Sequence, residues 1–200
     1  LYVTRMRVSD IKSLLRPDRD FASIAVERAI SEIRSGRPVL IRAGRSLAIA
    51  VGVEGLDDGA AYLLESLARG RARLALTAPR LKKLGFDRSG PGVIALPLID
   101  VKRIQTLAMD IGARYDAPAA HLSKLDKAAM ELVRLSLVAP AVIVVPVAAK
   151  SIAGTMLATV DASAIEIYRA HQVTELSIVS RAPVPLEGAP ETEFVVFRGG

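Results

Sequence analysis

The chain has 200 residues and a mass of 21.3 kDa, the size of one large domain or two small ones. Hydrophobic residues make up 51% and charged residues 24%, a balance typical of a globular protein and not of a disordered chain. The net charge is +6, and the chain contains no cysteine. The lack of cysteine excludes disulfides, thiolate zinc sites, iron–sulfur clusters and a cysteine nucleophile.

Helical and strand patterns alternate along the chain after a polar segment, residues 1–19, which we predict to be a tail. The predicted helices carry apolar residues at spacings of three and four and cover residues 21–34, 60–68, 78–85, 101–112, 127–137 and 162–171. The predicted strands are short apolar runs between turn signals and cover residues 39–41, 47–51, 74–76, 93–96, 142–147, 176–180 and 194–197. This alternation predicts an α/β or α+β fold, in which a mixed sheet is covered by helices. We expect one domain over residues 20–182, followed by a linker in residues 183–200.

The longest apolar run, residues 137–149, raises the question of a membrane span. It has thirteen residues with Pro140 and Pro146 inside it, whereas a spanning helix needs about 20 apolar residues. Its β-branched content is instead typical of a buried strand. The N-terminus has no apolar core of the signal-peptide type. We therefore expect a soluble cytoplasmic protein.

Charge is unevenly distributed. Residues 161–200 carry three arginines and six acids, so the first 160 residues carry 24 basic and 15 acidic side chains, a net charge of +9. The densest basic run, Arg69 to Lys83, has six cations and no acid. Two interpretations stay open: a solvated surface, or a site for an anionic partner such as nucleic acid or a phosphorylated metabolite. No aromatic residue is interleaved for base stacking, which argues against nucleic acid.

Motifs that would carry catalysis are missing. No glycine-rich turn leads into a helix to hold a phosphate, and Ser46 has no histidine or acid in reach by sequence. His121 and His171 lie 50 residues apart without acids at metal-ligand spacing, and both are interpreted as structural. The adjacent acids Asp57 and Asp58 are interpreted as helix caps.

Four stretches resemble, in order, parts of 3,4-dihydroxy-2-butanone 4-phosphate synthase, which makes a riboflavin precursor from ribulose 5-phosphate. They are AVERAISEIRSGRPVLI (25–41), ARGRARLALTAPRLKKLGF (68–86), AAMELVRLSLVAPAVIVV (128–145) and GTMLATVDASAIEIYRAHQVTELSIV (154–179). The resemblance covers roughly residues 22–182. It implies the mixed sheet of that family and, because the family is dimeric, a homodimer.

The catalytic motifs of that family do not carry over. Its acidic loop, which supplies metal-binding and acid–base carboxylates, is replaced here by RAGRS (Arg42 to Ser46). Its G-H-T-E motif, which supplies a metal-binding histidine and phosphate contacts, aligns with Lys124, Leu125, Asp126 and Lys127. Mg²⁺ needs oxygen ligands, and both sources of ligands are lost together. The resemblance therefore implies no catalytic residue, no metal ligand and no cofactor in this segment.

The final stretch, APVPLEGAPETEFVVFRGG (182–200), resembles the junction found in some bacterial GTP cyclohydrolase II proteins. These proteins carry a degenerate synthase-like domain before the cyclohydrolase domain. The resemblance implies that residues 183–200 lead into a covalently linked cyclohydrolase domain, and that zinc and GTP bind only there. It implies a non-catalytic, cytoplasmic domain that acts in oligomerisation, stability or regulation.

Two alternatives remain. One is an active enzyme with a rebuilt site for ribulose 5-phosphate or another sugar phosphate, in which the candidate anion contacts are Arg42, Arg45, Ser46, Lys124 and Lys127. The other is an RNA-binding module, which the basic charge of the first 160 residues and a distant likeness to threonylcarbamoyl-adenosine synthase folds suggest.

Overall fold

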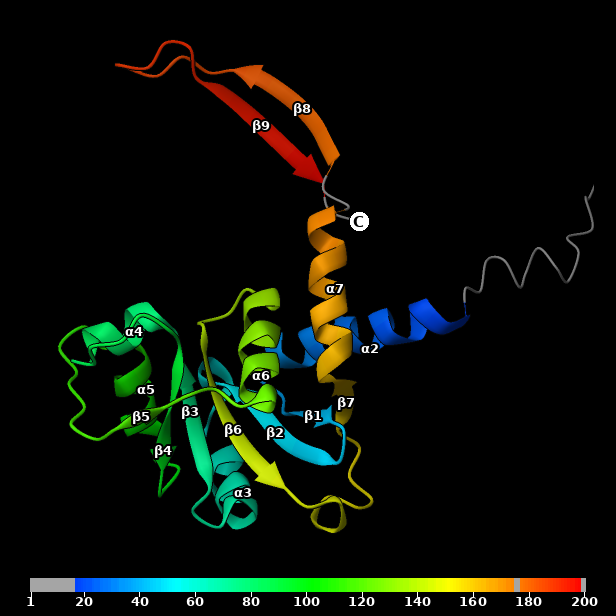
Figure 1. Ribbon diagram of the computed structural model, residues 1–200, viewed down its shortest axis with the longest axis vertical. Coiled ribbons are helices and arrows are strands. Elements are labelled where there is room, and N and C mark those ends of the chain that lie inside the picture. Colours follow the sequence, from blue (N-terminus) through cyan, green and yellow to red (C-terminus); the bar gives the residue numbers. More distant parts are fainter. Residues whose placement is uncertain (1–16, 175–176, 199–200) are drawn as a thin grey trace, which may run out of the picture. The chain divides into compact units, whose positions relative to one another are not determined.

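The structure is a computed structural model that describes residues 17–174 and 177–198. These residues fall into two compact units that meet between Ile165 and Glu166 (Figure 1). Within the described ranges, none of the helices combines the length and the apolar character that a membrane-spanning segment needs.

The first unit is built on a seven-stranded mixed sheet, in the order β5-β4-β3-β6-β2-β1-β7. Its strands are β1 (Val39–Ala43), β2 (Ser46–Gly52), β3 (Ala72–Leu76), β4 (Gly92–Leu96), β5 (Ala119–Ala120), β6 (Ala141–Val147) and β7 (Ala158–Asp161). Its helices are α2 (Pro17–Arg34), α3 (Asp58–Ala68), α4 (Ala78–Lys83), α5 (Val101–Met109) and α6 (Lys124–Leu135), with short 3₁₀ turns η1 (Val53–Gly55) and η2 (Ala149–Ser151). The predicted mixed sheet covered by helices is confirmed.

The β-branched run that was too short to span a membrane forms β6, at the middle of the sheet. β6 is antiparallel to both β2 and β3, and its first five residues, 141–145, are buried. β1 and β2 form the predicted hairpin, with Gly44 in its turn at a φ of 61°. At the sheet edge β1 also pairs in parallel with β7, from Val39 opposite Ala158 to Arg42 opposite Asp161.

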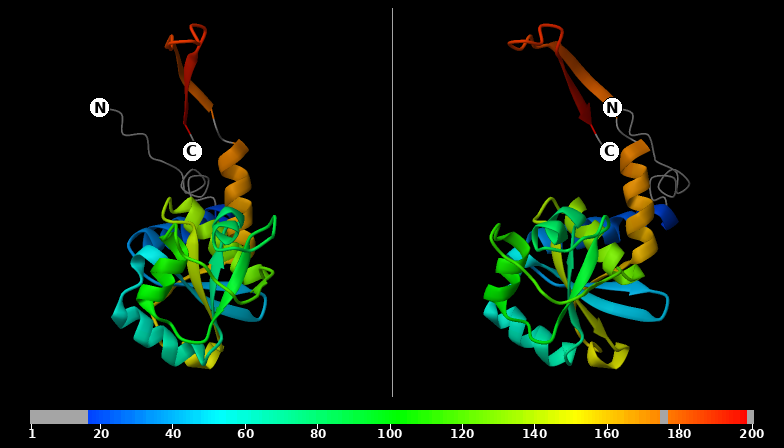
Figure 2. Two further views of the ribbon diagram at one scale, coloured as in Figure 1. Left: turned by 90° about the vertical axis from the view of Figure 1, so that its left-hand side faces the viewer. Right: turned by 60° about the vertical axis from the view of Figure 1, so that its left-hand side comes forward.

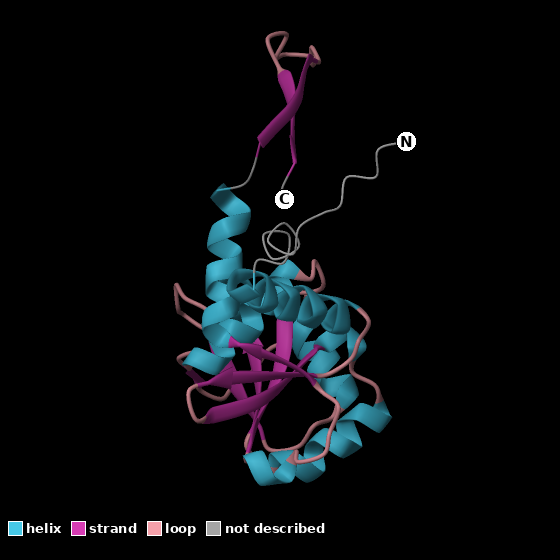
Figure 3. Ribbon diagram, turned by 90° about the vertical axis from the view of Figure 1, so that its right-hand side faces the viewer, coloured by secondary structure: helices cyan, strands magenta, loops and turns pink. Residues whose placement is uncertain are grey.

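Helices cover both faces of the sheet (Figures 2 and 3). On one face, side chains of α3, α4 and α5 pack into a core with Leu74 of β3 and Ile143 of β6. α2 and α6 contact each other and cover the opposite face of the central strands. Because side chains alternate along a strand, Leu74 points to the first face, and its neighbour Arg73 points to the face that carries α6.

Gly36 ends α2 as predicted, at a φ of 74° that favours glycine. It also lies against Gly55 of η1. A Cβ atom on Gly55 would lie 2.3 Å from the Cα atom of Gly36. Only a pair of glycines allows these two backbones to approach so closely.

Two helices start three or more residues earlier than predicted. α2 begins at Pro17, so residues 17–19 of the predicted tail are helical, and residues 1–16 lie outside the described residues. α6 begins at Lys124, three residues earlier than expected, because Ser123 and Asp126 form a capping box at its N-terminus.

In the second unit, α7 (Ala162–Thr174), which starts in the first unit, is followed by a hairpin of β8 (Ser177–Pro183) and β9 (Glu193–Arg198). The two strands predicted here, at 176–180 and 194–197, are confirmed within the described residues and pair with each other. Residue 176 lies outside the described residues. All of β8 is exposed, and β9 is exposed except for the partly buried Val195. Phe194 and Phe197 lie on opposite faces of the hairpin, so both of its faces carry an exposed aromatic ring. The domain limits at residues 20 and 182 stay a prediction.

Candidate functional site

The first turn of α6 lies where the resemblance places the metal-binding and phosphate-binding motif of the synthase family. Asp126 in this turn is 1% exposed. Its Oδ1 accepts hydrogen bonds from Nε and Nη2 of Arg73, at 3.1 and 2.8 Å. Its Oδ2 accepts from the backbone N–H of Ser123 at 2.8 Å. Both carboxylate oxygens are therefore engaged inside the protein.

The residues next to Asp126 in the first turn of α6 differ in their exposure. Leu125, at the position of the family's histidine, is buried. Lys124 and Lys127 are exposed on the same helical turn. The turn therefore presents two cations to solvent and an apolar residue to the interior.

On the β1–β2 hairpin, Arg42 is bound to an acid. Its Nε and Nη2 donate to Oδ1 and Oδ2 of Asp161 on β7, at 2.6 and 2.8 Å. These hydrogen bonds hold the pKa of the Asp161 carboxyl below its ordinary value, although partial burial acts in the opposite direction. Arg45 and Ser46 are exposed at and beside the turn.

The five predicted anion contacts come from different parts of the sheet surface. Leu40 belongs to the core under α3, so Arg42, two residues later on β1, points to that same face. Lys124 and Lys127 belong to α6, which covers the other face. The structure therefore brings the two lysines together and places the Arg42 side chain on the opposite face. Their binding role stays a prediction.

The residues at these positions do not fit Mg²⁺, the metal of the synthase family. Magnesium takes oxygen ligands in a near-octahedral array. The hairpin turn supplies Arg42 and Arg45 and no carboxylate. In the first turn of α6 the carboxylate is that of Asp126, which is already bound by Arg73 and Ser123.

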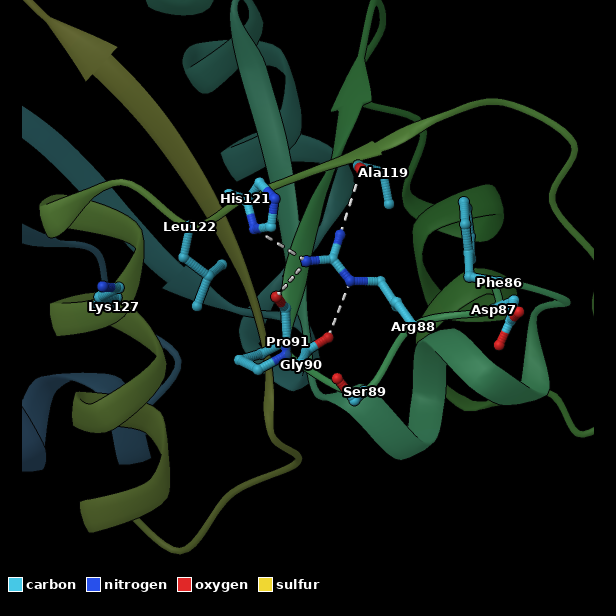
Figure 4. Close-up of a pocket in the computed structure, with 10 residues that line it drawn as sticks. All are labelled: Phe86, Asp87, Arg88, Ser89, Gly90, Pro91, Ala119, His121, Leu122 and Lys127. Atoms are coloured by element: carbon cyan, nitrogen blue, oxygen red, sulfur yellow. Dashed lines mark hydrogen bonds between the residues drawn. The ribbon is translucent and has the colours of Figure 1, made fainter.

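A pocket of about 630 Å³ lies beside the first turn of α6 (Figure 4). The loop of residues 86–91, between α4 and β4, forms one side of it. Ala119, His121, Leu122 and Lys127 form the rest. Its size is within the range of small-molecule sites.

Arg88 lines this pocket, and Figure 4 shows its guanidinium pointing toward Ala119, Pro91 and His121. Each of its five N–H groups has an acceptor. Four are backbone carbonyls, those of Gly90 and Pro91 in its own loop and of Ala119 and Ala120 in β5, at 2.9 to 3.2 Å. The fifth is Nδ1 of His121, at 3.5 Å. Since a guanidinium only donates, Nδ1 of His121 is the acceptor in this contact. The structural role of His121 stays a prediction. Arg88 therefore fastens the loop to the edge strand.

The sequence analysis did not single out Arg88 or Gly92. A Cβ atom on Gly92 would lie 2.5 Å from Nη1 of Arg88 and 2.7 Å from the carbonyl oxygen of Ala120. Glycine is thus needed for the guanidinium to lie against the strand. The run SGPG (residues 89–92) was the available signal, but it indicates only a turn.

The basic run from Arg69 to Lys83 does not act as one patch. Arg73 is paired with Asp126. Arg80 donates to the backbone carbonyls of Leu107, Thr106 and Asp110 at the C-terminal end of α5, at 2.6 to 2.9 Å. Burial lowers the pKa of Arg80 below its ordinary value. Two of the six cations therefore have structural partners.

No protein-family model matches the chain. Two curated relatives are named GTP cyclohydrolase-2. The protein from Xylella fastidiosa (strain Temecula1) is 32% identical over 184 residues, and that from Azospirillum brasilense is 34% identical over 199 residues. The matches cover 90% and 91% of this chain but 46% and 52% of those proteins. The chain therefore spans about half the length of the curated relatives it matches.

Solved structures of 3,4-dihydroxy-2-butanone 4-phosphate synthase share the fold. A cation-free synthase matches 72% of this chain and 96% of its own, with a TM-score of 0.59 and 10% identity. RibBX, a two-domain synthase from A. baumannii, matches 87% of this chain and 66% of its own, with a TM-score of 0.58 and 16% identity. Because 87% of 200 residues is 174, the second match extends beyond the 165 residues of the first unit. The chain thus has the fold of 3,4-dihydroxy-2-butanone 4-phosphate synthase, and it is similar in sequence to part of the GTP cyclohydrolase-2 proteins.

Proposed function

We propose that this chain is the non-catalytic synthase-like domain of a riboflavin-biosynthesis protein of the GTP cyclohydrolase II type. It acts in the oligomerisation, stability or regulation of that protein. The observation that carries the proposal is the hydrogen bonding of Asp126, whose two carboxylate oxygens are engaged by Arg73 and Ser123.

A catalytic acid or metal ligand needs a free oxygen that faces the substrate or the ion. Asp126 is instead 1% exposed and holds α6 against β3. The cation Arg73 also lies next to this turn, where it would repel Mg²⁺. These features support a structural use of the turn in place of the chemistry that the synthase family performs there.

The β8–β9 hairpin supports a covalently linked partner domain. An isolated two-stranded hairpin is marginally stable in water, and this one exposes Phe194, Phe197 and Ile178. The relatives are about twice as long as this chain. We propose that the cyclohydrolase domain of such a protein packs on the hairpin, and that zinc and GTP belong to that domain.

We also propose a cytoplasmic homodimer, as the synthase resemblance implies.

The test of the non-catalytic proposal is turnover of ribulose 5-phosphate by the purified chain, with and without Mg²⁺, followed by phosphorus NMR. An active synthase assayed in the same buffer is the positive control. We expect no conversion above the rate in buffer alone. Mg²⁺-dependent conversion that the Asp126→Asn variant abolishes would overturn the proposal.

The oligomerisation proposal is tested separately, by light scattering coupled to size exclusion. We expect a mass near 43 kDa, twice the 21.3 kDa of one chain. A monomer at all accessible concentrations would contradict the homodimer and leave a role in stability or regulation.

A further inference from the structure

Basic side chains from two segments meet in a second pocket, which is separate from the synthase-like motif. The pocket has a volume of about 420 Å³ and lies between α5 and residues 113–115. Its charged lining consists of Lys102, Arg103, Arg114 and one acid, Asp100. α5 contributes Ile104 and Leu107 to the core on the face of the sheet opposite α6. The pocket is therefore on the other side of the sheet from Lys124 and Lys127.

The single acid does not neutralise these cations. Oδ1 of Asp100 accepts a hydrogen bond from the backbone N–H of Arg103 at 2.8 Å and caps α5. Within residues 17–174 and 177–198, the side chains of Lys102 and Arg103 donate no hydrogen bond and form no ion pair. Among the described residues, Arg114 donates only through Nη1, to the backbone carbonyls of Lys83 and Ala113, both at 3.0 Å. Most of the donors of the three cations are thus available to a ligand.

The position of Lys102 and Arg103 is unfavourable for the stability of α5. Both lie in its first turn, where the helix dipole is positive and where an acid would be stabilising. α3 and α6 have the acids Asp58 and Asp126 in their first turns, whereas the acid at this end of α5 is the N-cap Asp100 and the first turn itself carries Lys102 and Arg103. Two cations in a first turn are a local conflict of the kind that functional sites often contain.

Two of the cations are nevertheless held in place. The guanidinium of Arg103 lies over the ring of Tyr115, 5.9 Å from its centroid. That ring packs against Phe86 at 6.1 Å, and its hydroxyl donates to the carbonyl of Ala95 at 3.4 Å. Arg114 is fixed by the carbonyl of Lys83. A ligand would therefore meet cations that are already positioned, which reduces the entropy lost on binding.

We propose that this pocket binds the phosphate group of a small metabolite through Lys102, Arg103 and Arg114. A phosphate carries up to two negative charges and several acceptor oxygens, and it suits a set of guanidinium and ammonium donors better than a singly charged carboxylate does. The site does not depend on the proposed function, because none of its residues belongs to the synthase-like motif or to the β8–β9 hairpin.

The test is a calorimetric titration of the chain with inorganic phosphate at low salt, with acetate as the singly charged comparison. The variant Lys102→Gln/Arg103→Gln removes two of the three cations. Lys150→Gln removes one exposed cation of η2 outside the pocket and is the control for the loss of a surface charge. We expect saturable binding of one phosphate, at least tenfold weaker in the double variant and unchanged in Lys150→Gln. Absence of saturable binding, or equal weakening in both variants, would overturn the proposal.

Two further measurements make the result decisive. The double variant should melt at the same temperature as the unmodified chain or higher, because like-charge repulsion at α5 is removed. Loss of phosphate binding in a variant with this melting temperature is then not caused by unfolding. A titration with a short single-stranded RNA separates a small ligand from a polymer. RNA affinity a thousandfold above that of phosphate, which the double variant reduces and added salt weakens steeply, would contradict the small metabolite and assign the pocket to nucleic acid.

Discussion

The guanidinium of Arg73 on β3 donates two hydrogen bonds to one carboxylate oxygen of Asp126 on α6, although the two residues are 53 positions apart. The second oxygen accepts from the backbone of Ser123, so one buried carboxylate caps the helix and fastens it to the sheet. The same helical turn holds the residues that we align with the G-H-T-E motif of the synthase family, and its geometry is set by this contact.

Replacement of Asp126 by alanine should lower the free energy of unfolding by about 2–4 kcal/mol. The substitution removes half of the capping box and leaves Arg73 half-buried without its acid, and both effects destabilise. Urea denaturation measures the change. Asp116→Ala, at an exposed position, is the control and should stay within about 0.5 kcal/mol. Equal effects of the two substitutions would show that the Arg73–Asp126 pair does not contribute to the free energy of unfolding.

Gly92 and Gly90 lie two residues apart and should respond differently to alanine. At Gly92 the new methyl group would meet Nη1 of Arg88 at 2.5 Å and the backbone of Ala120 at 2.7 Å, so the loop or the edge strand must move. We expect Gly92→Ala to cost about 1–3 kcal/mol, the usual cost of overpacking. Gly90 has nothing within 4 Å of such a methyl group, and Gly90→Ala should be nearly neutral. Thermal unfolding of both variants distinguishes a steric requirement from a flexible loop.

The Arg42–Asp161 pair should make stability depend on pH in the acidic range. The folded pKa of Asp161 lies below its ordinary value of 3.8, so its contribution is present above that value. The contribution is lost as the pH falls through the folded pKa. Both side chains are about half exposed, which limits the contribution at neutral pH to about 1 kcal/mol or less.

Asp161→Asn checks this expectation. The difference in unfolding free energy between the unmodified chain and the variant should be largest at pH 7 and should close below the folded pKa. Asp116→Asn, the same change at an exposed acid, should show no such trend. A difference that persists unchanged into strong acid would mean that the asparagine side chain destabilises the fold for a steric reason, and that the charge of Asp161 does not contribute to stability.

Arg80 should contribute more to the stability of the fold than its basic neighbour Lys82 does. Arg80 supplies donors to three carbonyls at the end of α5, whereas Lys82 is exposed. Hydrogen bonds from a charged donor contribute about 1.5–3 kcal/mol to the free energy of unfolding. Arg80→Gln removes them and leaves the end of α5 uncapped, so it should destabilise the fold, whereas Lys82→Gln should not. Hydrogen exchange at the last turn of α5 reports the same contact locally. Faster exchange in both variants alike would contradict the assignment.

Local patterns were enough to predict most of the fold. The β-branched run at 142–147 predicted a central buried strand, because neither face of that strand has polar residues to place in solvent. The two apolar runs on either side of Gly44 predicted the hairpin. In both cases neighbours in the sequence carry the information that the structure uses.

The candidate site was harder to predict because its contacts are tertiary. The six cations from Arg69 to Lys83 are continuous in sequence, but the pleat of β3 turns Arg73 toward α6, and α4 turns Arg80 toward the end of α5. Arg88 binds backbone carbonyls, which every residue possesses, so no side-chain pattern identifies its partners. The early start of α6 follows from the capping box of Ser123 and Asp126, a signal that the sequence did contain.

The parallel pairing of β1 with β7 has a consequence for the order of folding on the ribosome. Arg42 meets Asp161 across 119 residues of chain, and everything between them must be synthesised before that edge of the sheet can close. At about 5–20 residues per second, β1 is left with an open hydrogen-bonding edge for roughly 6–24 s. Such an edge is a template for pairing with other chains. Nascent-chain crowding and chaperone access should therefore affect the yield of this domain more than its final stability would suggest.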